Sequence, residues 1–389
     1  MRVVIEALSA RLGGGQTYLR NLLRCDLPRG MEVFLIAPKE LSLPHLGRGV
    51  ERLPVGDRLD NPMLRLAWSH VALPKILRRL NADVLFAPGG ALLGRAPPRC
   101  RTVTMFRNMI PFDPVQLGRY GLRYQRARLL LLRRVLARSM SRADLVIFIS
   151  EYGRSIIRAS GVRVQRGVVI PHGVDPRFRL VAPGVSAPSG VTAEFIVYVS
   201  ILDMYKHQVE VVRAYAALLR SRPTTREKLL LIGSAYPPYE RQVRTEVERW
   251  GLGDKVVLGG AIPNEALPDI YQNAKLIVFA SESENCPNIL LEGMASGRPM
   301  LSSSFPPMPE FGGDAVCYFD PRSAPELTER MATLLDDPRR ADALGAAAHQ
   351  RSLGFDWKVT AQKTWSAIAD LNPRAPGDET LARRNRVST

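Results

Sequence analysis

The chain has 389 residues, 46% of them hydrophobic, with 54 Lys and Arg against 37 Asp and Glu and a formal net charge of +17. This length suits two ordinary domains, each with its own core. No run of about 18 or more uncharged apolar residues occurs, so we expect neither a membrane-spanning helix nor a leader. The four cysteines lack disulfide-framework or zinc-finger spacing, so we expect a reducing, cytoplasmic location.

Strand-like and helix-like segments alternate along the first half. We expect strands at residues 1–8, 31–38, 83–88, 101–106, 144–150 and 167–175. We expect helices at residues 17–23, 64–80, 119–142 and 151–160. This alternation is typical of a doubly wound parallel sheet, and it predicts an α/β domain over residues 1–175.

A segment rich in proline and glycine, residues 176–193, interrupts the pattern and predicts an interdomain linker. The alternation then resumes over residues 194–355, which predicts a second domain of the same class. The helical stretch 356–371 follows, and we expect the tail 372–389 to be disordered. Two such domains in tandem favour a ligand-binding cleft between them.

The most informative segment is residues 281–299, SESENCPNILLEGMASGRP. A short apolar strand precedes it, and Pro287 suits the first turn of a helix that continues to Gly297. Glu284 therefore lies before the helix and Glu292 about a turn inside it. The N–H groups at a helix start suit a diphosphate, and nearby carboxylates can accept hydrogen bonds from sugar hydroxyls. The alternative is a structural turn with two solvated glutamates.

The pattern Glu-x7-Glu followed by GMASGRP resembles the signature of family-4 retaining glycosyltransferases, also called group 1 glycosyltransferases. The resemblance implies the GT-B fold, in which two Rossmann-like domains face a cleft and the last helix crosses back to the N-terminal domain. It also implies that Glu292 binds the ribose and Glu284 lies at the donor sugar. It places Asn285, Asn288 and Ile289 beside them in the donor-binding segment.

Lys206 follows a predicted strand, where an ammonium could neutralise the donor diphosphate. In the resembling family an arginine usually precedes this lysine by five or six residues, but here those positions are Ile201 and Ser200. Backbone amides or an arginine from elsewhere must then complete the phosphate site. The alternative for Lys206 is a solvated loop residue.

In the first domain, Gly14 and Gly15 belong to a glycine-rich loop that leads into a helix, where the backbone can approach a ligand closely. The loop is not G-x-G-x-x-G, so it gives little support to a dinucleotide site. The resemblance places Arg107 and Asn108 where relatives carry a catalytic His followed by Asp or Asn. We interpret both as candidate catalytic residues in place of a histidine base, although an arginine in this basic half could be a surface charge.

The positive charge is concentrated in the first half. Residues 1–180 hold 31 Lys and Arg against 12 Asp and Glu, or +19, which leaves 23 against 25, or −2, for residues 181–389. The predicted basic helix 119–142 contains no acid. An arginine-rich, leucine-rich helix favours an anionic membrane surface, with an ordinary amphipathic helix as the alternative. Nucleic acid ranks last, because no nucleic-acid-binding motif accompanies the charge.

We therefore expect a retaining, metal-independent transferase that moves a sugar from a nucleoside-diphosphate co-substrate to a glycan or lipid-linked hydroxyl, with no separate cofactor. Its five histidines form no H-x-E or H-E-x-x-H pattern, which argues against a catalytic metal. Surface polysaccharide or lipopolysaccharide synthesis at the inner face of a membrane would suit the basic domain. The alternatives are a sugar-nucleotide epimerase or hydrolase of the same fold, and a degenerate module that binds polyanions or membrane.

Overall fold

A computed structural model describes residues 1–10, 14–39, 41, 43, 46–56, 59, 61–119, 123–179 and 194–371. The chain forms two compact units. The first comprises Met1–Phe112, Leu122–Pro171 and Trp357–Thr389, and the second comprises Asp113–Gly121 and His172–Asp356. The part of the predicted linker beyond residue 179 and the predicted disordered tail 372–389 lie outside the described residues.

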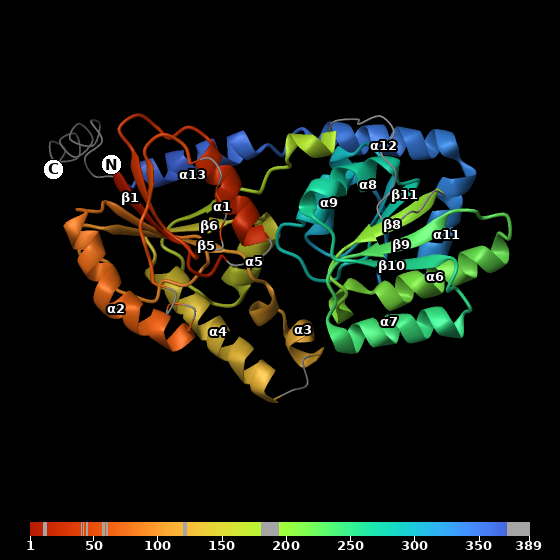
Figure 1. The fold of residues 1–389 in the computed structure, drawn as a ribbon, viewed down its shortest axis with the longest axis horizontal. Coiled ribbons are helices and arrows are strands. Elements are labelled where there is room, and N and C mark those ends of the chain that lie inside the picture. The colour runs from red at the N-terminus through yellow and green to blue at the C-terminus, as the bar shows by residue number, and fades with distance from the viewer. Residues whose placement is uncertain are drawn as a thin grey trace, which may run out of the picture. The chain divides into compact units, whose positions relative to one another are not determined.

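The first unit is built on a parallel sheet in the order β3-β2-β1-β4-β5-β6-β7. Its strands are β1 (Arg2–Glu6), β2 (Glu32–Ile36), β3 (Val50–Arg52), β4 (Val84–Ala87), β5 (Arg101–Phe106), β6 (Leu145–Phe148) and β7 (Gly167–Val169). The helices are α1 (Gly14–Arg24), α2 (Pro62–Arg79), α4 (Arg123–Arg142), α5 (Glu151–Ala159) and α13 (Trp357–Ala369). Helices α1 and α13 cover one face of the sheet and α2 and α4 the other (Figure 1). The prediction of a doubly wound α/β domain is confirmed.

The second unit repeats the arrangement in the order β10-β9-β8-β11-β12-β13. Its strands are β8 (Phe195–Val199), β9 (Lys228–Ile232), β10 (Val256–Gly260), β11 (Leu276–Phe279), β12 (Met300–Ser303) and β13 (Cys317–Phe319). Its longer helices are α6 (Gln208–Ser221), α7 (Pro237–Arg249), α8 (Leu267–Asn273), α9 (Asn288–Ala295), α11 (Ala324–Asp336) and α12 (Pro338–Ser352). Strands β8 and β11 are buried along their whole length, which explains their continuous apolar runs.

The last helix belongs to the first unit, as predicted. The Tyr18 ring of α1 packs edge-on against Trp357 of α13, with 6.2 Å between the ring centroids. The Tyr18 and Thr364 hydroxyl groups are 3.4 Å apart, and both residues are buried. Figure 1 shows α1 and α13 side by side. A chain segment more than three hundred residues from α1 therefore completes the first core.

The predicted beginning of the basic helix 119–142 is wrong. Arg119 ends a separate short helix, α3 (Pro114–Arg119), which belongs to the second unit, and α4 begins at Arg123. Residues 120–122 lie outside the described residues. The sequence Gly118-Arg-Tyr-Gly121 explains the difference, because glycine disfavours a helix interior. The predicted boundary of the first domain at residue 175 also differs, since the second unit takes up the chain again at His172.

The beginning of the predicted linker is ordered structure. Residues Pro176–Arg179 form the 3-10 helix η3, and Phe178 is buried with its ring centroid 5.9 Å from that of Tyr271. Arg179 donates hydrogen bonds of 2.9 Å to the backbone oxygens of Ser352 and Phe355. The proline and glycine content of the segment gave no sign of these contacts, because the partners are distant in sequence. Strands β3 and β13, three residues each, were also not predicted.

Candidate functional site

Two candidate residues of the second unit meet where the strand order of its sheet reverses. Strands β8 and β11 are direct neighbours, although two strands separate them in sequence. In parallel sheets a crevice forms at the carboxyl ends of such strands, because their connections leave in opposite directions. Lys206 follows β8 and Glu284 follows β11. Sheet topology therefore brings the two loops together.

Lys206 and Glu284 form a direct ion pair. Lys206 ends the 3-10 helix η5 (Met204–Lys206), and its side chain is 6% exposed against 18% for Glu284. The ammonium also lies 4.9 Å from the ring centroid of Tyr205 and 5.4 Å from that of Phe279. Ser281 donates a hydrogen bond of 2.8 Å to the same Glu284 oxygen, Oε1. The alternative of a solvated loop lysine is wrong, because this cation is held by a carboxylate and two aromatic rings.

Helix α9 begins at Asn288, directly after Pro287, as the sequence predicted. The Asn288 side-chain oxygen lies 2.9 Å from Nδ1 of His172, which is buried. Asn285 is buried and Ile289 is half-buried, and both lie at this end of the helix. The contact of His172 with Asn288 links the first residues of the second unit to the start of α9.

Glu292 lies inside α9, half-buried, within electrostatic reach of Asp175 and Arg177. Burial raises the pKa of its carboxyl to about 8, and the charge of Asp175 adds to this rise while Arg177 opposes it. The carboxyl thus keeps its proton at neutral pH. Glu292 is not the solvated surface glutamate of the alternative interpretation.

A third glutamate of the same loop, Glu282, was not among the candidates. Its side chain is 3% exposed, and its Oε2 lies 2.5 Å from Arg119 Nη2 and 2.9 Å from His207 Nε2. Its other oxygen accepts a hydrogen bond from Arg322. Burial alone would raise the pKa of Glu282, but the hydrogen bonds from Arg322 and His207, with the charge of Arg119, hold it below its usual value. The only sequence signal was an acid two residues before Glu284.

His207 holds a backbone conformation that few residues adopt. Its φ of 54° and ψ of 32° are left-handed, a region that glycine normally fills. Its ring lies between two carboxylates, with Nε2 at Glu282 and Nδ1 3.4 Å from Glu210. Such strain persists only where the surroundings impose it, and it is common at binding sites. These two contacts hold the imidazole ring of His207, the residue that follows Lys206, in a fixed orientation.

Three of the four candidates of the first unit come together: Gly14, Gly15 and Arg107. Gly14 and Gly15 are the first residues of α1, and a Cβ on Gly15 would lie 3.5 Å from Nη1 of Arg107. The Arg107 guanidinium carbon is 5.6 Å from the ring centroid of Tyr18, also on α1. Asn108 is exposed, and its side chain accepts a hydrogen bond of 3.2 Å from the Ile110 N–H. Arg107 thus lies at the glycine-containing helix start, whereas Asn108 caps a turn; their catalytic roles remain predictions.

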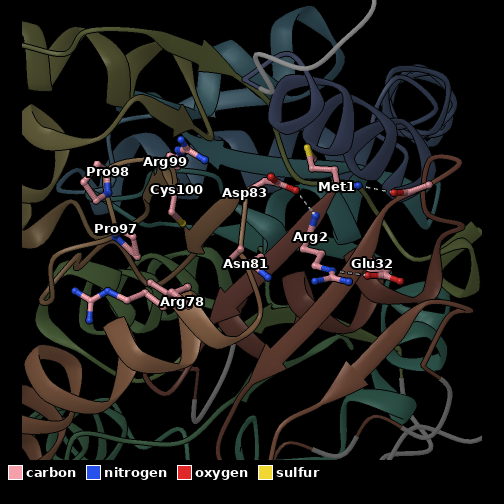
Figure 2. Close-up of a pocket in the computed structure, with 13 residues that line it drawn as sticks. Met1, Arg2, Glu32, Arg78, Asn81, Asp83, Pro97, Pro98, Arg99 and Cys100 are labelled. Carbon is pink, nitrogen blue, oxygen red and sulfur yellow. Dashed lines mark hydrogen bonds and ion pairs between the residues drawn. The ribbon is translucent and has the colours of Figure 1, made fainter.

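A cavity of about 950 Å³ lies elsewhere in the first unit. Figure 2 shows its lining at the amino ends of β1, β2, β4 and β5, opposite to the strand ends that carry the candidates. Arg2 pairs with Glu32 at 3.0 Å, and its backbone N–H donates to Asp83 at 2.8 Å. These polar groups therefore supply one another's hydrogen-bond partners at the amino ends of the strands. None of the candidate site residues lines this cavity.

Within the described ranges, no three His, Cys, Asp or Glu side chains gather as metal ligands would. Metal independence itself stays a prediction. All four cysteines are free thiols: Cys25, Cys100, Cys286 and Cys317. Over the same residues, no helix is both long and apolar enough to pass through a bilayer.

Two family models match the chain. Residues 12–178 match the model described as "Glycosyltransferase Family 4", and residues 186–351 match "Glycosyl transferases group 1". The boundary between the two matches falls near the change from the first unit to the second. The segment with Glu284 and Glu292 lies inside the second match.

Curated relatives are similar at modest identity. A D-inositol 3-phosphate glycosyltransferase of Kineococcus radiotolerans is 28% identical over 54% of this chain and 53% of its own length. This chain therefore aligns with only about half the length of the first such relatives. A GDP-mannose-dependent alpha-(1-6)-phosphatidylinositol monomannoside mannosyltransferase of Mycolicibacterium smegmatis is 24% identical over 92% of this chain and 95% of its own.

Among solved structures, HepE of Anabaena in complex with UDP and glucose matches with a TM-score of 0.72 at 19% identity. The match covers 95% of this chain and all of the HepE chain. Identity at this level shows a shared fold, and the fold agrees with the two parallel-sheet units described above.

The Lys206–Glu284 pair can be tested by unfolding in urea. Lys206→Met or Glu284→Gln should each lower the free energy of unfolding by about 3 kcal/mol, because each leaves a buried partner without its counter-charge. The double variant should lose clearly less than the sum of the two. Strictly additive losses would contradict a direct pair.

Glu292 should make stability depend on pH. The folded carboxyl releases its proton near pH 8, whereas the unfolded one does so near its ordinary value of 4.5. Its contribution is therefore complete below pH 4.5 and is lost as the pH rises toward and through 8. As the pH rises across this range, the thermal midpoint of Glu292→Gln should increase relative to that of the wild type, because the wild type loses stability and the variant does not. The exposed α7 residue Glu248 provides a matched control, and a pH-independent difference for Glu292→Gln would contradict the assignment.

Proposed function

Since this chain belongs to the family-4, group 1 glycosyltransferases, we propose that it transfers a sugar from a nucleoside-diphosphate donor to an acceptor hydroxyl. The observation that carries the proposal is the Lys206–Glu284 pair at the strand-order reversal of the second unit. A buried ammonium beside a carboxylate is suited to a ligand that joins a diphosphate to a sugar. The start of α9 adds the backbone N–H groups of a helix N-terminus, which suit an anion.

Three candidates in the second unit each have a chemical task in this reaction. Lys206 neutralises the charge that develops on the diphosphate as its bond to the sugar breaks. Glu284, released from Lys206 by that phosphate, accepts hydrogen bonds from the sugar hydroxyls. Glu292 holds the ribose, and its protonated carboxyl can both donate to and accept from a ribose hydroxyl.

We further propose that the transfer retains the anomeric configuration and needs no metal. The bond between the anomeric carbon and the diphosphate oxygen breaks, and the acceptor oxygen bonds to that carbon from the same face. The acceptor proton passes to the departing phosphate oxygen, so no protein nucleophile is required. Support comes from the match to the family and from the cation that Lys206 supplies in place of a metal.

The proposed acceptor is a glycan or lipid-linked hydroxyl, as in surface polysaccharide or lipopolysaccharide synthesis. The relative from Mycolicibacterium smegmatis is named for a phosphatidylinositol mannoside, and an Escherichia coli relative, 24% identical over 69% of this chain, is named an O-antigen chain mannosyltransferase. These names favour an acceptor anchored at a membrane. They leave the sugar and the base of the donor open.

We propose that α4 brings the enzyme to an anionic membrane. Tyr124 is 79% exposed and Leu131 62% exposed, so the helix presents apolar side chains to solvent. Among its exposed residues are Arg126, Arg128 and Arg134. Guanidinium groups near lipid phosphates with apolar groups beside them form the usual interfacial helix. Arg119 has no part in this surface, because it pairs with Glu282 in the other unit.

Donor binding can be measured directly. Purified protein is incubated with UDP-, GDP-, ADP- and dTDP-sugars, and thermal stabilisation and nucleotide release are recorded for the wild type and for Glu292→Ala. One nucleotide class should stabilise the wild type, and Glu292→Ala should weaken that binding by about tenfold or more, because a buried partner of the ribose is lost. Glu248→Ala serves as the control. Stabilisation by no nucleotide would favour a degenerate module.

Membrane docking can be measured by co-sedimentation with vesicles of phosphatidylcholine, with and without phosphatidylglycerol. Replacing Arg126, Arg128 and Arg134 by Gln should weaken binding to the anionic vesicles roughly a hundredfold, at about 1 kcal/mol for each arginine. Matched replacements on α7 remove the same charge and should change little: Arg241, Arg244 and Arg249. Equal losses for both triple variants would contradict docking through α4.

A further inference from the structure

Glu282 is a buried carboxylate that faces three groups able to carry positive charge. Arg119 reaches it from α3, His207 from the start of α6, and Arg322 from the loop between β13 and α11. These segments are far apart in sequence. The three contacts gather them around one side chain that is 3% exposed.

Two arginines share the Glu282 carboxylate, although one arginine would be enough to neutralise it. A second carboxylate, Glu210, lies on the other side of the His207 ring, 3.4 Å from Nδ1. The second half of the chain is not basic as a whole, since residues 181–389 carry a net charge of −2. The two arginines at Glu282 are therefore a local feature of this cluster and not part of a generally basic surface.

The cluster adjoins the proposed donor site. The Glu282 N–H donates a hydrogen bond of 2.8 Å to the backbone oxygen of Tyr205, and His207 directly follows Lys206. Glu282 and Glu284 lie on the same loop. The loop that carries the Lys206 partner Glu284 thus also holds two arginines, through Glu282.

We propose that Arg322 and Arg119, held in place by Glu282, bind a phosphate group of a substrate next to Lys206. This inference rests on the proposed function. Glu282 acts as a positioning residue, and the two arginines make the contact. The phosphate belongs either to the diphosphate of the donor or to a phosphorylated acceptor, since both offer the same chemistry to a guanidinium.

The two arginines keep donors available for such a ligand. The Arg322 side chain is 49% exposed, and within the described residues only one of its five N–H donors, on Nη2, has a side-chain acceptor. Its guanidinium carbon lies 4.7 Å from the ring centroid of Phe305, which fixes the plane of the fork. Arg119 is 27% exposed. A guanidinium fixed by a carboxylate and a ring loses little freedom on binding a phosphate.

Segment α3 is fixed to the same loop by a second contact. Ser283 donates a hydrogen bond of 3.2 Å to Asp113, at the residue before α3. Arg119 therefore comes from a helix that is attached to the loop at both ends, through Asp113 and through Glu282. Its place beside Arg322 follows from packing within the second unit and not from a flexible surface side chain.

The test compares Arg322→Gln and Arg119→Gln with the wild type by calorimetric titration with UDP and GDP. The control is Arg244→Gln, which also removes an arginine from an ion pair with a glutamate, on α7. For a donor phosphate, we expect about a tenfold loss of diphosphate affinity in each test variant, a smaller loss in Arg322→Lys, and none in the control. Thermal midpoints of all variants establish that they are folded.

A second arm separates the two sources of the phosphate. Inorganic phosphate is titrated into protein saturated with the preferred nucleoside diphosphate. Phosphate binding that persists there and is lost in Arg322→Gln, with unchanged nucleotide affinity, assigns the arginines to the acceptor. Phosphate that the nucleotide excludes, with weakened nucleotide affinity in the variants, assigns them to the donor.

The inference is overturned if Arg322→Gln and Arg119→Gln fold and bind both the nucleotide and phosphate as the wild type does. That result leaves the proposed function intact as long as Glu292→Ala weakens nucleotide binding. If instead no nucleotide binds the wild type and Glu292→Ala has no effect, the proposed function fails, and this inference fails with it.

Discussion

The need to pair two carboxylates on the loop after β11 organises the second unit around its candidate site. Glu282 and Glu284 are held away from water by the surrounding loops, where an ionised carboxylate is costly unless cations and hydrogen-bond donors surround it. Lys206 meets Glu284, and Arg119, His207 and Arg322 meet Glu282. These contacts join segments from four places in the sequence.

This pairing has a functional consequence that a neutral core would not have. The partners of a buried ion pair can be exchanged for a charged ligand at little net cost, because the desolvation of the protein groups has already occurred on folding. A diphosphate that approaches Lys206 would replace Glu284 as its counter-charge. Glu284 would then be free to meet a hydroxyl. The Lys206–Glu284 ion pair thus holds both charged groups in place before a donor binds.

Much of the fold could be predicted from the sequence, and the reason is local. Apolar runs such as those of β8 and β11 have the length and continuity of strands buried on both faces, and Pro287 with Gly297 bounds helix α9 closely. The positions of Glu284 before α9 and Glu292 inside it follow directly. The three-residue strands β3 and β13 were missed because a run that short carries no periodicity.

The predictions that failed concern residues whose partners are distant. The sequence predicts Arg119 as part of a basic helix, but the structure places it on α3, paired with Glu282. The sequence predicts residues 176–179 as linker, but Phe178 and Arg179 pack within the second unit. Nothing in the neighbouring sequence distinguishes these residues from surface charges and turn residues.

The sequence by itself determined the class of the fold, the order of its longer strands and most of its helices, and the segment that carries the candidate glutamates. Periodicity, helix boundaries and motif spacing are local properties of the chain. The tertiary structure alone decided which charges meet. Strand order places β8 beside β11 and hence Lys206 beside Glu284, and packing brings Arg119 and Arg322 to Glu282. Partners separated by 78, 163 and 40 residues are chosen by the folded sheet and not by the chain between them.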